Sequence, residues 1–212
     1  MKKTDKSQLI LATAGALFLT QGYRDTSMRE LAAQCDIGLG LITYYFKSKR
    51  ELAKSCLQHH FQKIEASVNA AAPFSSDVLL YHATYLRYAN KYFMHPKRRQ
   101  LYYELLEEGI YSDYIYETVP HTLHELNTVF QAGLSEDYVL LYGNYVPMDL
   151  EKTLVLKKRD GLFRQISEDE IPTIVFENAV SHLVRDVAVT ERAVEQSIVL
   201  CEKLMQQEEF FT

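Results

Sequence analysis

The side chains best suited to bind a polyanion lie together in residues 36–52, DIGLGLITYYFKSKREL. The hydroxyls of Thr43, Tyr44 and Tyr45 can reach base edges or phosphate oxygens of a nucleic acid. The basic cluster that follows and could neutralise phosphates consists of Lys47, Lys49 and Arg50. This order of side chains favours nucleic-acid recognition, although a single tyrosine in a helical pair more often serves packing.

Capping residues predict the helices that hold these side chains. Ser27 and Glu30 have capping-box spacing, which predicts a helix over 28–34. A short glycine-containing turn at 35–38 should follow, and then a second helix at 39–46. Two short helices joined by such a turn form a helix-turn-helix.

The second predicted helix has two different faces. Ile42 and Phe46 are four residues apart and should point inward. On the outward face, Gly40 lets the backbone approach a partner closely, and Leu39 and Leu41 can contact thymine methyl groups. We expect this outward face to lie against a DNA groove.

Charge is distributed unevenly along the 212 residues. Residues 1–50 contain eight Lys and Arg against four Asp and Glu, a formal charge of +4, whereas residues 51–212 contain fifteen against twenty-four, a charge of −9. A basic N-terminal segment (the head) followed by an acidic remainder (the body) fits a polyanion-binding module, although random scatter of surface charge would also produce it.

The hydrophobic share of 47% and the apolar spacings of three and four predict a nearly all-α globular protein.

The first twenty residues superficially resemble a secretory signal. Polar residues 5–8 separate the basic start from the apolar run, and Ile10, Ala14 and Leu17 repeat on one helical face. We therefore expect a core helix that ends near Gly22, and no later run reaches membrane-spanning length.

Cysteine and histidine spacing indicates neither a metal site nor a disulfide framework. Cys35, Cys56 and Cys201 are odd in number and far apart, which favours reduced thiols and a cytoplasmic location over a thiol sensor. His121 and His124 share a helical face but have no acidic or cysteine partner at metal-ligand spacing. The sequence thus predicts no metal, no cofactor and no catalytic residue.

The run TSMRELAAQCDIGLGLITYYFKSKREL, residues 26–52, resembles the DNA-binding motif of the TetR family of bacterial transcriptional regulators. The resemblance implies a three-helix helix-turn-helix domain at 1–48 and a larger helical effector-binding and dimerisation domain at 49–212. Family members often carry different side chains at Gly38, Leu39 and Thr43, which leaves the operator sequence open. The DNA-binding set predicted from the helix faces and the resemblance is Thr26, Ser27, Gly38, Leu39, Gly40, Leu41, Thr43, Tyr44, Tyr45, Lys47 and Lys49.

Tyrosines are concentrated in the body, where nine of the fifteen lie between residues 81 and 116. They could fill a tyrosine-rich core, or they could line a pocket for an effector, and rings with neighbouring carboxylates would favour a cationic or aromatic ligand. The predicted effector-binding set is Tyr81, Tyr85, Tyr88, Tyr92, Tyr103, Glu104, Glu107 and Tyr111.

Glycine and proline predict a break in the helices over 133–149, as a loop or a broken helix. Ser167 and Glu170 form a further capping box, opening a helix that should continue to Val187, and Thr190 should cap the last helix. This terminal pair could cover its own core, but the family resemblance implies that it pairs with its copy. The predicted dimer set is Ile171, Val175, Leu183, Val194, Ile198 and Leu204.

The resulting functional hypothesis is a ligand-responsive repressor that binds an inverted-repeat operator on double-stranded DNA as a homodimer, away from membranes. A small molecule of unknown identity would release it. One alternative is a helix-turn-helix regulator controlled by a protein partner, or constitutive. A helical enzyme is a remote alternative, since HExxH, GxSxG and GxxxxGK[ST] motifs are all absent.

Overall fold

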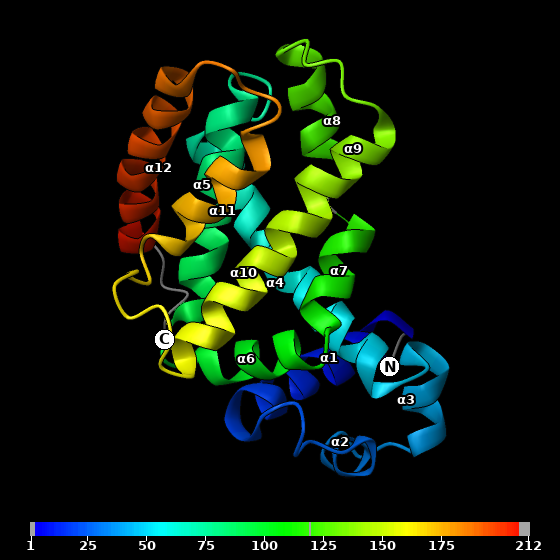
Figure 1. Ribbon diagram of the computed structural model, residues 1–212. Helices are drawn as coiled ribbons and strands as arrows, with labels where there is room; N and C mark the ends of the chain where they lie inside the picture. The colour runs from blue at the N-terminus through cyan, green and yellow to red at the C-terminus, as the bar shows by residue number, and fades with distance from the viewer. Residues whose placement is uncertain (1–2, 119, 208–212) are drawn as a thin grey trace. The chain divides into compact units, whose positions relative to one another are not determined.

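The computed structural model describes residues 3–118 and 120–207, and all the regular secondary structure in this part of the chain is helical, without strands (Figure 1). The all-α prediction is confirmed. Packing divides the chain into two compact units. The first combines residues 1–61 with 93–114, and the second combines 62–92 with 115–212. Helices α4 (Lys49–Ala71) and α5 (Val78–Met94) contribute to both units.

Helix α1 (Lys3–Gln21) contributes one apolar face to the core of the first unit. Its buried face contains Ile10, Ala14 and Leu17, as the spacing predicts. The helix ends at Gly22, whose φ of +94° lies in the left-handed region that glycine adopts without a steric penalty.

Helices α2 (Met28–Gln34) and α3 (Leu39–Phe46) form the helix-turn-helix. The Ser27 hydroxyl accepts a hydrogen bond from the Glu30 amide at 3.1 Å, so the predicted cap is confirmed. In the turn, the left-handed residue is Asp36 with φ +50°, whereas Gly38 has φ −70° and precedes α3 in extended conformation. Asp36 tolerates this conformation because its short polar side chain can bond locally.

The rest of the first unit is organised around aromatic rings. Ser48 caps α4 through the Glu51 amide at 3.2 Å, and α6 (Arg99–Glu107) and the first part of α7 (Ile110–Thr118) complete the unit. Ring pairs 4.9 to 5.7 Å apart join the rings of Phe61, Phe93, Tyr102, Tyr111 and Tyr114. Such contacts add to the stabilisation from apolar burial.

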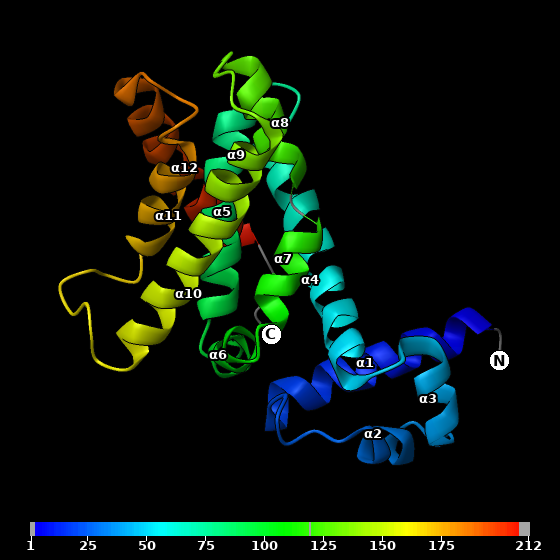
Figure 2. The same ribbon diagram turned by 45° about the vertical axis from the view of Figure 1, so that its right-hand side comes forward.

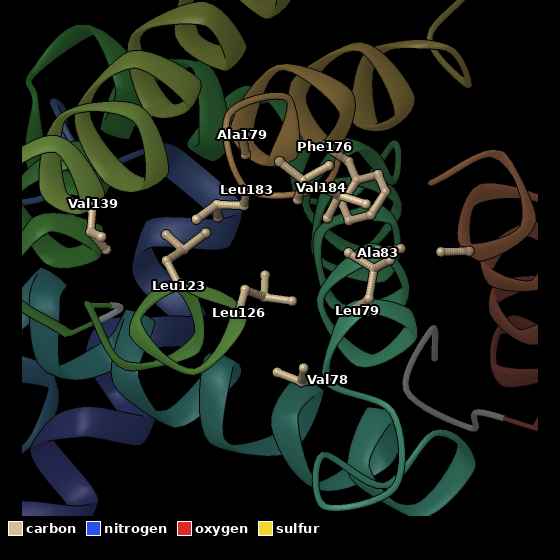
Figure 3. Close-up of a cluster of buried hydrophobic side chains, with 12 residues drawn as sticks. Val78, Leu79, Ala83, Leu123, Leu126, Val139, Phe176, Ala179, Leu183 and Val184 are labelled. Atoms are coloured by element: carbon tan, nitrogen blue, oxygen red, sulfur yellow. The ribbon is translucent and has the colours of Figure 1, made fainter. Parts of the chain in front are cut away.

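The second unit contains α8 (Pro120–Val129), α9 (Glu136–Leu140), the π-helical turn η1 (Leu141–Tyr145), α10 (Val146–Arg159), α11 (Ile171–Val180) and α12 (Val187–Gln207). Figures 1 and 2 both show α11 beside α10. Apolar side chains from α5, α8, α9, α11 and α12 meet in one core cluster, including Leu79, Leu126 and Phe176 (Figure 3).

The helix boundaries agree with the sequence in one place and differ in another. Over 133–149 the structure shows the broken-helix alternative, since residues 136–159 form a helical run interrupted by the π turn. Gly143 lies in the π turn, at a position where Leu123 of α8 occupies the space that a Cβ would need. Helix α11 ends at Val180 instead of reaching residue 187, and Thr190 lies inside α12.

Candidate nucleic-acid interface

The outward face of α3 is open to solvent above a buried face. Ile42 and Phe46 are buried, while Tyr44 is 67% and Leu39 is 38% exposed. Thr43 is exposed, and its hydroxyl donates to the Gly40 carbonyl at 3.1 Å. The two-faced helix predicted from the sequence is therefore present.

The glycines around the start of α3 are not required by packing within the chain. A Cβ built on Gly38 or Gly40 meets no atom within 4 Å, and both residues are exposed. Gly40 costs helix stability relative to alanine, by about 0.5–1 kcal/mol. Its place on the outward face leaves room for close backbone approach to another molecule. Leu41 and Tyr45 flank this face and are half-buried.

Thr26 and Lys49 shape the turn that precedes α2. Thr26 is 2% exposed, and its hydroxyl donates to the Gly22 carbonyl at 2.7 Å. The Lys49 ammonium donates to the carbonyls of Tyr23, Arg24 and Thr26 at 2.9, 3.2 and 3.0 Å. Because an ammonium has three donors, this arrangement engages all of them. Both residues thus position the helix-turn-helix from within, while Ser27 caps α2 at the surface.

An ionic network connects this turn to α6 within the same unit. Glu104 accepts from the Arg24 amide at 3.0 Å, and the Arg24 guanidinium binds Glu107 at 3.0 Å and Glu108 at 2.8 Å. The hydrogen bond that the Arg24 guanidinium donates to Glu108 raises the pKa of Arg24 against the opposing effect of burial. Two members of the predicted effector-binding set, Glu104 and Glu107, are therefore bound to the head.

The basic cluster at the end of α3 is divided between two roles. Arg50 donates to the carbonyls of Glu108 and Gly109 at 2.9 and 3.2 Å. It also pairs with Asp113, and this pairing raises the pKa of Arg50. Lys47 is exposed at the end of α3. Sequence reasoning missed Arg29, an exposed cation of α2 that its position just after the Ser27 cap could have indicated.

The predicted effector-binding set is split between the two packing units. Tyr81, Tyr85, Tyr88 and Tyr92 belong to the second unit, on α5. Tyr103 and Tyr111 are buried in the first unit with Glu104 and Glu107. Tyr88 is fully buried, and its hydroxyl has no hydrogen-bond partner among the described residues.

Most of the predicted dimer set is buried inside the chain's own fold. Ile171, Val175, Leu183 and Leu204 are all almost inaccessible, and Val194 is half-buried. Ile198 is exposed on α12. A partner chain would reach few of these side chains.

The part of the chain that the structure describes shows neither a metal-binding cluster nor a membrane-spanning helix. Across residues 3–118 and 120–207, no group of three or more His, Cys, Asp and Glu could hold a metal ion. In the same residues, no helix is both long and apolar enough to cross a membrane.

Comparison with known sequences places the motif in a family. The profile of "Bacterial regulatory proteins, tetR family" matches residues 10–56. YuxN of Bacillus subtilis strain 168, an uncharacterized HTH-type transcriptional regulator, is 41% identical over 59 residues, which cover 28% of this chain and 20% of YuxN. An uncharacterized HTH-type regulator of Xanthobacter autotrophicus is 33% identical over 36% of this chain and 38% of its own. The matches thus span about a fifth to two fifths of these curated relatives.

Solved structures share the fold over nearly the whole chain. RolR, in complex with resorcinol, superimposes with a TM-score of 0.62 at 14% identity, over 92% of this chain and 93% of RolR. A gamma-butyrolactone receptor, an ArpA-like protein, has a TM-score of 0.53 at 15% identity, over 96% of this chain and 100% of its own. Residues 10–56 thus carry the helix-turn-helix motif of the tetR family of bacterial regulatory proteins, and the chain as a whole shares its fold with these solved structures.

Proposed function

We propose that the protein is a repressor that binds an inverted-repeat operator as a homodimer and is released by a small-molecule effector. The observation that carries the proposal is the α3 face on which Leu39, Thr43 and Tyr44 are exposed above a buried Ile42 and Phe46. An outward face of this kind fits the major groove. Residues 1–48 act as the head in this proposal and residues 49–212 as the effector-binding and dimerisation body.

The residues proposed for DNA binding fall into two groups: exposed side chains that would contact DNA, and buried or fully bonded ones that hold the motif in place. Leu39, Gly40 and the Thr43 methyl suit thymine methyl groups and base edges, and Tyr44 is placed to reach bases or phosphate. The exposed cation Lys47 suits phosphate. The buried Thr26 and the fully engaged Lys49 hold the turn from which α2 begins, so their effect on binding is indirect.

The effector-responsive part of the proposal is supported by the shared fold. RolR, similar in fold, is known in complex with resorcinol, a small aromatic ligand. Release requires only that the effector bind one conformation of the dimer better than the other, and about 1.4 kcal/mol of coupling weakens operator binding tenfold. We place this action in the cytoplasm, where three free cysteines stay reduced.

The proposed dimer uses an apolar face of the 136–159 run instead of the buried faces of α11 and α12. Tyr138, Leu141 and Tyr145 are exposed and spaced three and four residues apart, so they lie on one side of that run. Tyr142 packs between Tyr138 and His182, with ring centroids 5.8 and 3.9 Å away. A stripe of exposed apolar side chains on one side of a helical run is typical of an interaction surface.

Replacing Leu141 with glutamate is expected to dissociate the dimer, because it puts a charge into the centre of the stripe. Sedimentation of the natural chain should give twice the monomer mass, whereas Leu141→Glu should sediment as a monomer with unchanged helicity. Val129→Glu, an exposed apolar position on α8 outside the stripe, is the matched control. A natural chain that is monomeric at micromolar concentration, or a dimeric Leu141→Glu variant, overturns this choice of face.

If the outward face of α3 binds the major groove, Tyr44→Ala and Gly40→Ala should each weaken operator binding about tenfold or more while the chain stays folded. Tyr44→Ala removes a contact, whereas Gly40→Ala adds a methyl group where the backbone should approach the duplex. Gly40→Ala should also raise thermal stability slightly, because alanine favours the helix and meets no neighbour.

The measurement is fluorescence anisotropy with a duplex recovered by selection from a random-sequence pool. Phe163→Ala, which truncates an exposed ring in the loop before α11, should bind as the natural chain does. If no inverted repeat is enriched, or if both α3 variants retain full affinity, α3 does not bind DNA and the proposal fails.

A further inference from the structure

A cleft of about 620 Å³ lies within the second packing unit, between α4, α5 and α8. From α4, Glu65 and Asn69 line it, with spacing that puts both on one helix face. Thr122 and Glu125 line it from α8, three residues apart. This volume is in the range of sites for organic ligands and is far larger than a metal ion needs.

The apolar wall of the cleft is built by two aromatic rings. Phe74 and Tyr81 pack edge to face with ring centroids 5.2 Å apart, and Tyr85 stacks on Tyr81 at 6.0 Å. The loop that carries Phe74 is held in place because the Phe74 amide donates to the Asn69 side chain at 3.0 Å. These contacts restrain the wall in the absence of a ligand, and such preorganisation lowers the entropic cost of binding.

The charged side chains of the cleft are carboxylates. Glu65 and Glu125 are both exposed to solvent, and the lining contains no Lys, Arg or His. Within the described part of the chain, no cation pairs with either carboxylate. The field of Glu65 also acts on the Tyr81 phenol: burial first, and then Glu65, raises the pKa of Tyr81 to about 12. Glu65 thus lies near the aromatic wall, and Tyr81 is an uncharged hydroxyl at neutral pH.

We propose that this cleft binds an organic cation, with its charged group near Glu65 and Glu125 and its apolar part against Phe74 and Tyr81. The carboxylates select against anions, and ring faces attract cations in addition to providing apolar contact. The second lone pair of the Asn69 amide oxygen and the hydroxyl of Thr122 offer acceptors to an N–H of the ligand. The regulatory consequence, release of the operator by such a cation, rests on the proposed function, whereas binding itself does not.

Tetraphenylphosphonium and tetraphenylborate test the proposal because they have nearly the same shape and opposite charge. Calorimetric titration of the full chain at low ionic strength should show the phosphonium binding at least about tenfold more tightly than the borate. Added salt should weaken phosphonium binding, since exposed carboxylates are screened.

Charge-removing variants connect the binding to the two carboxylates. Glu65→Gln and Glu125→Gln should each weaken phosphonium binding about threefold to tenfold, and the double variant should bind the two probes equally. Glu191→Gln, an exposed carboxylate on α12, is the matched control and should change nothing. Equal affinity for the two probes in the natural chain, or single variants with unchanged affinity, overturns the proposal.

A second readout separates this inference from the proposed function. The phosphonium is added to the complex of the full chain with its selected duplex, and anisotropy is followed. Release that Glu65→Gln suppresses supports the cleft as the effector site. Calorimetric binding without release supports the cleft and contradicts its regulatory role. A chain that selects no duplex but binds the phosphonium refutes the proposed function and leaves the cation site standing.

Discussion

Replacing Gly22 with alanine is expected to lower the free energy of unfolding by about 2–4 kcal/mol. One cause is the backbone, because a φ of +94° is strained for any residue with a Cβ. The other is space: the Cβ would lie 2.7 and 2.9 Å from the two carboxylate oxygens of Glu104. That carboxylate cannot withdraw freely, since it accepts from the Arg24 amide at 3.0 Å and from Gln100 at 3.2 Å.

Urea unfolding of the natural chain, Gly22→Ala and Gly15→Ala measures this effect. Gly15 lies inside α1 and has no atom within 4 Å of a built Cβ, so alanine there should be neutral or stabilise by up to about 1 kcal/mol. Combining Gly22→Ala with Glu104→Ala should recover the steric part of the loss and leave the backbone part. If the free energy of unfolding of Gly22→Ala lay within about 0.5 kcal/mol of that of the natural chain, the turn would accommodate alanine without a loss of stability.

The same turn gives Gly22 a role in DNA binding under the proposed function. Gly22 accepts the hydrogen bond from the buried Thr26, one residue before the Ser27 cap of α2. A strained turn would therefore shift α2 and α3 together. We expect the operator affinity of Gly22→Ala to fall even at temperatures where the variant remains folded.

Local signals in the sequence predicted the helix caps and the two faces of α3. Ser27, Ser48 and Ser167 each accept from an amide three residues on, as their capping spacing indicates. The buried and exposed faces of α3 follow from a four-residue spacing that is equally local. Such features depend on neighbours within one helical turn, which is why a single sequence suffices to find them.

Contacts between distant segments could not be predicted. The bond between Arg24 and Glu104 spans 80 residues, and nothing in the local pattern distinguishes Glu104 from a ligand-binding carboxylate. The apolar faces of α11 and α12 have the periodicity of a buried face, but periodicity does not say whether the chain's own core or a second copy covers them. The cleft carboxylates Glu65 and Glu125 also come from separate helices, so no motif connects them.

His82 is expected to make the second unit sensitive to acid. Its side chain is 3% exposed on α5, its ring lies 5.9 Å from that of Phe176, and its Nε2 has no hydrogen-bond partner among the described residues. Burial lowers the pKa of His82 from 6.5 to about 4. The folded state therefore excludes the proton that the unfolded chain accepts.

The direction of the effect follows from proton linkage. Above pH 6.5, His82 is neutral in both states and costs no protonation energy. Between pH 6.5 and about 4 the unfolded state binds one more proton than the folded state, so stability falls as pH falls, by about 1.4 kcal/mol per pH unit and about 3 kcal/mol in all. His82→Leu removes this contribution. It also removes an unpartnered buried nitrogen, so at pH 7.5 the variant should be as stable as the natural chain or more so.

Urea unfolding at pH 7.5, 6.0, 5.0 and 4.5, at one fixed protein concentration, tests this prediction. The stability of the natural chain should fall more steeply than that of His82→Leu, and the difference between the two should widen with each step below pH 6.5. His59→Gln, which alters an exposed histidine of α4, should follow the natural chain. Parallel curves for the natural chain and His82→Leu would show that the folded protein accommodates the His82 proton, and burial of this ring would then have no part in acid unfolding.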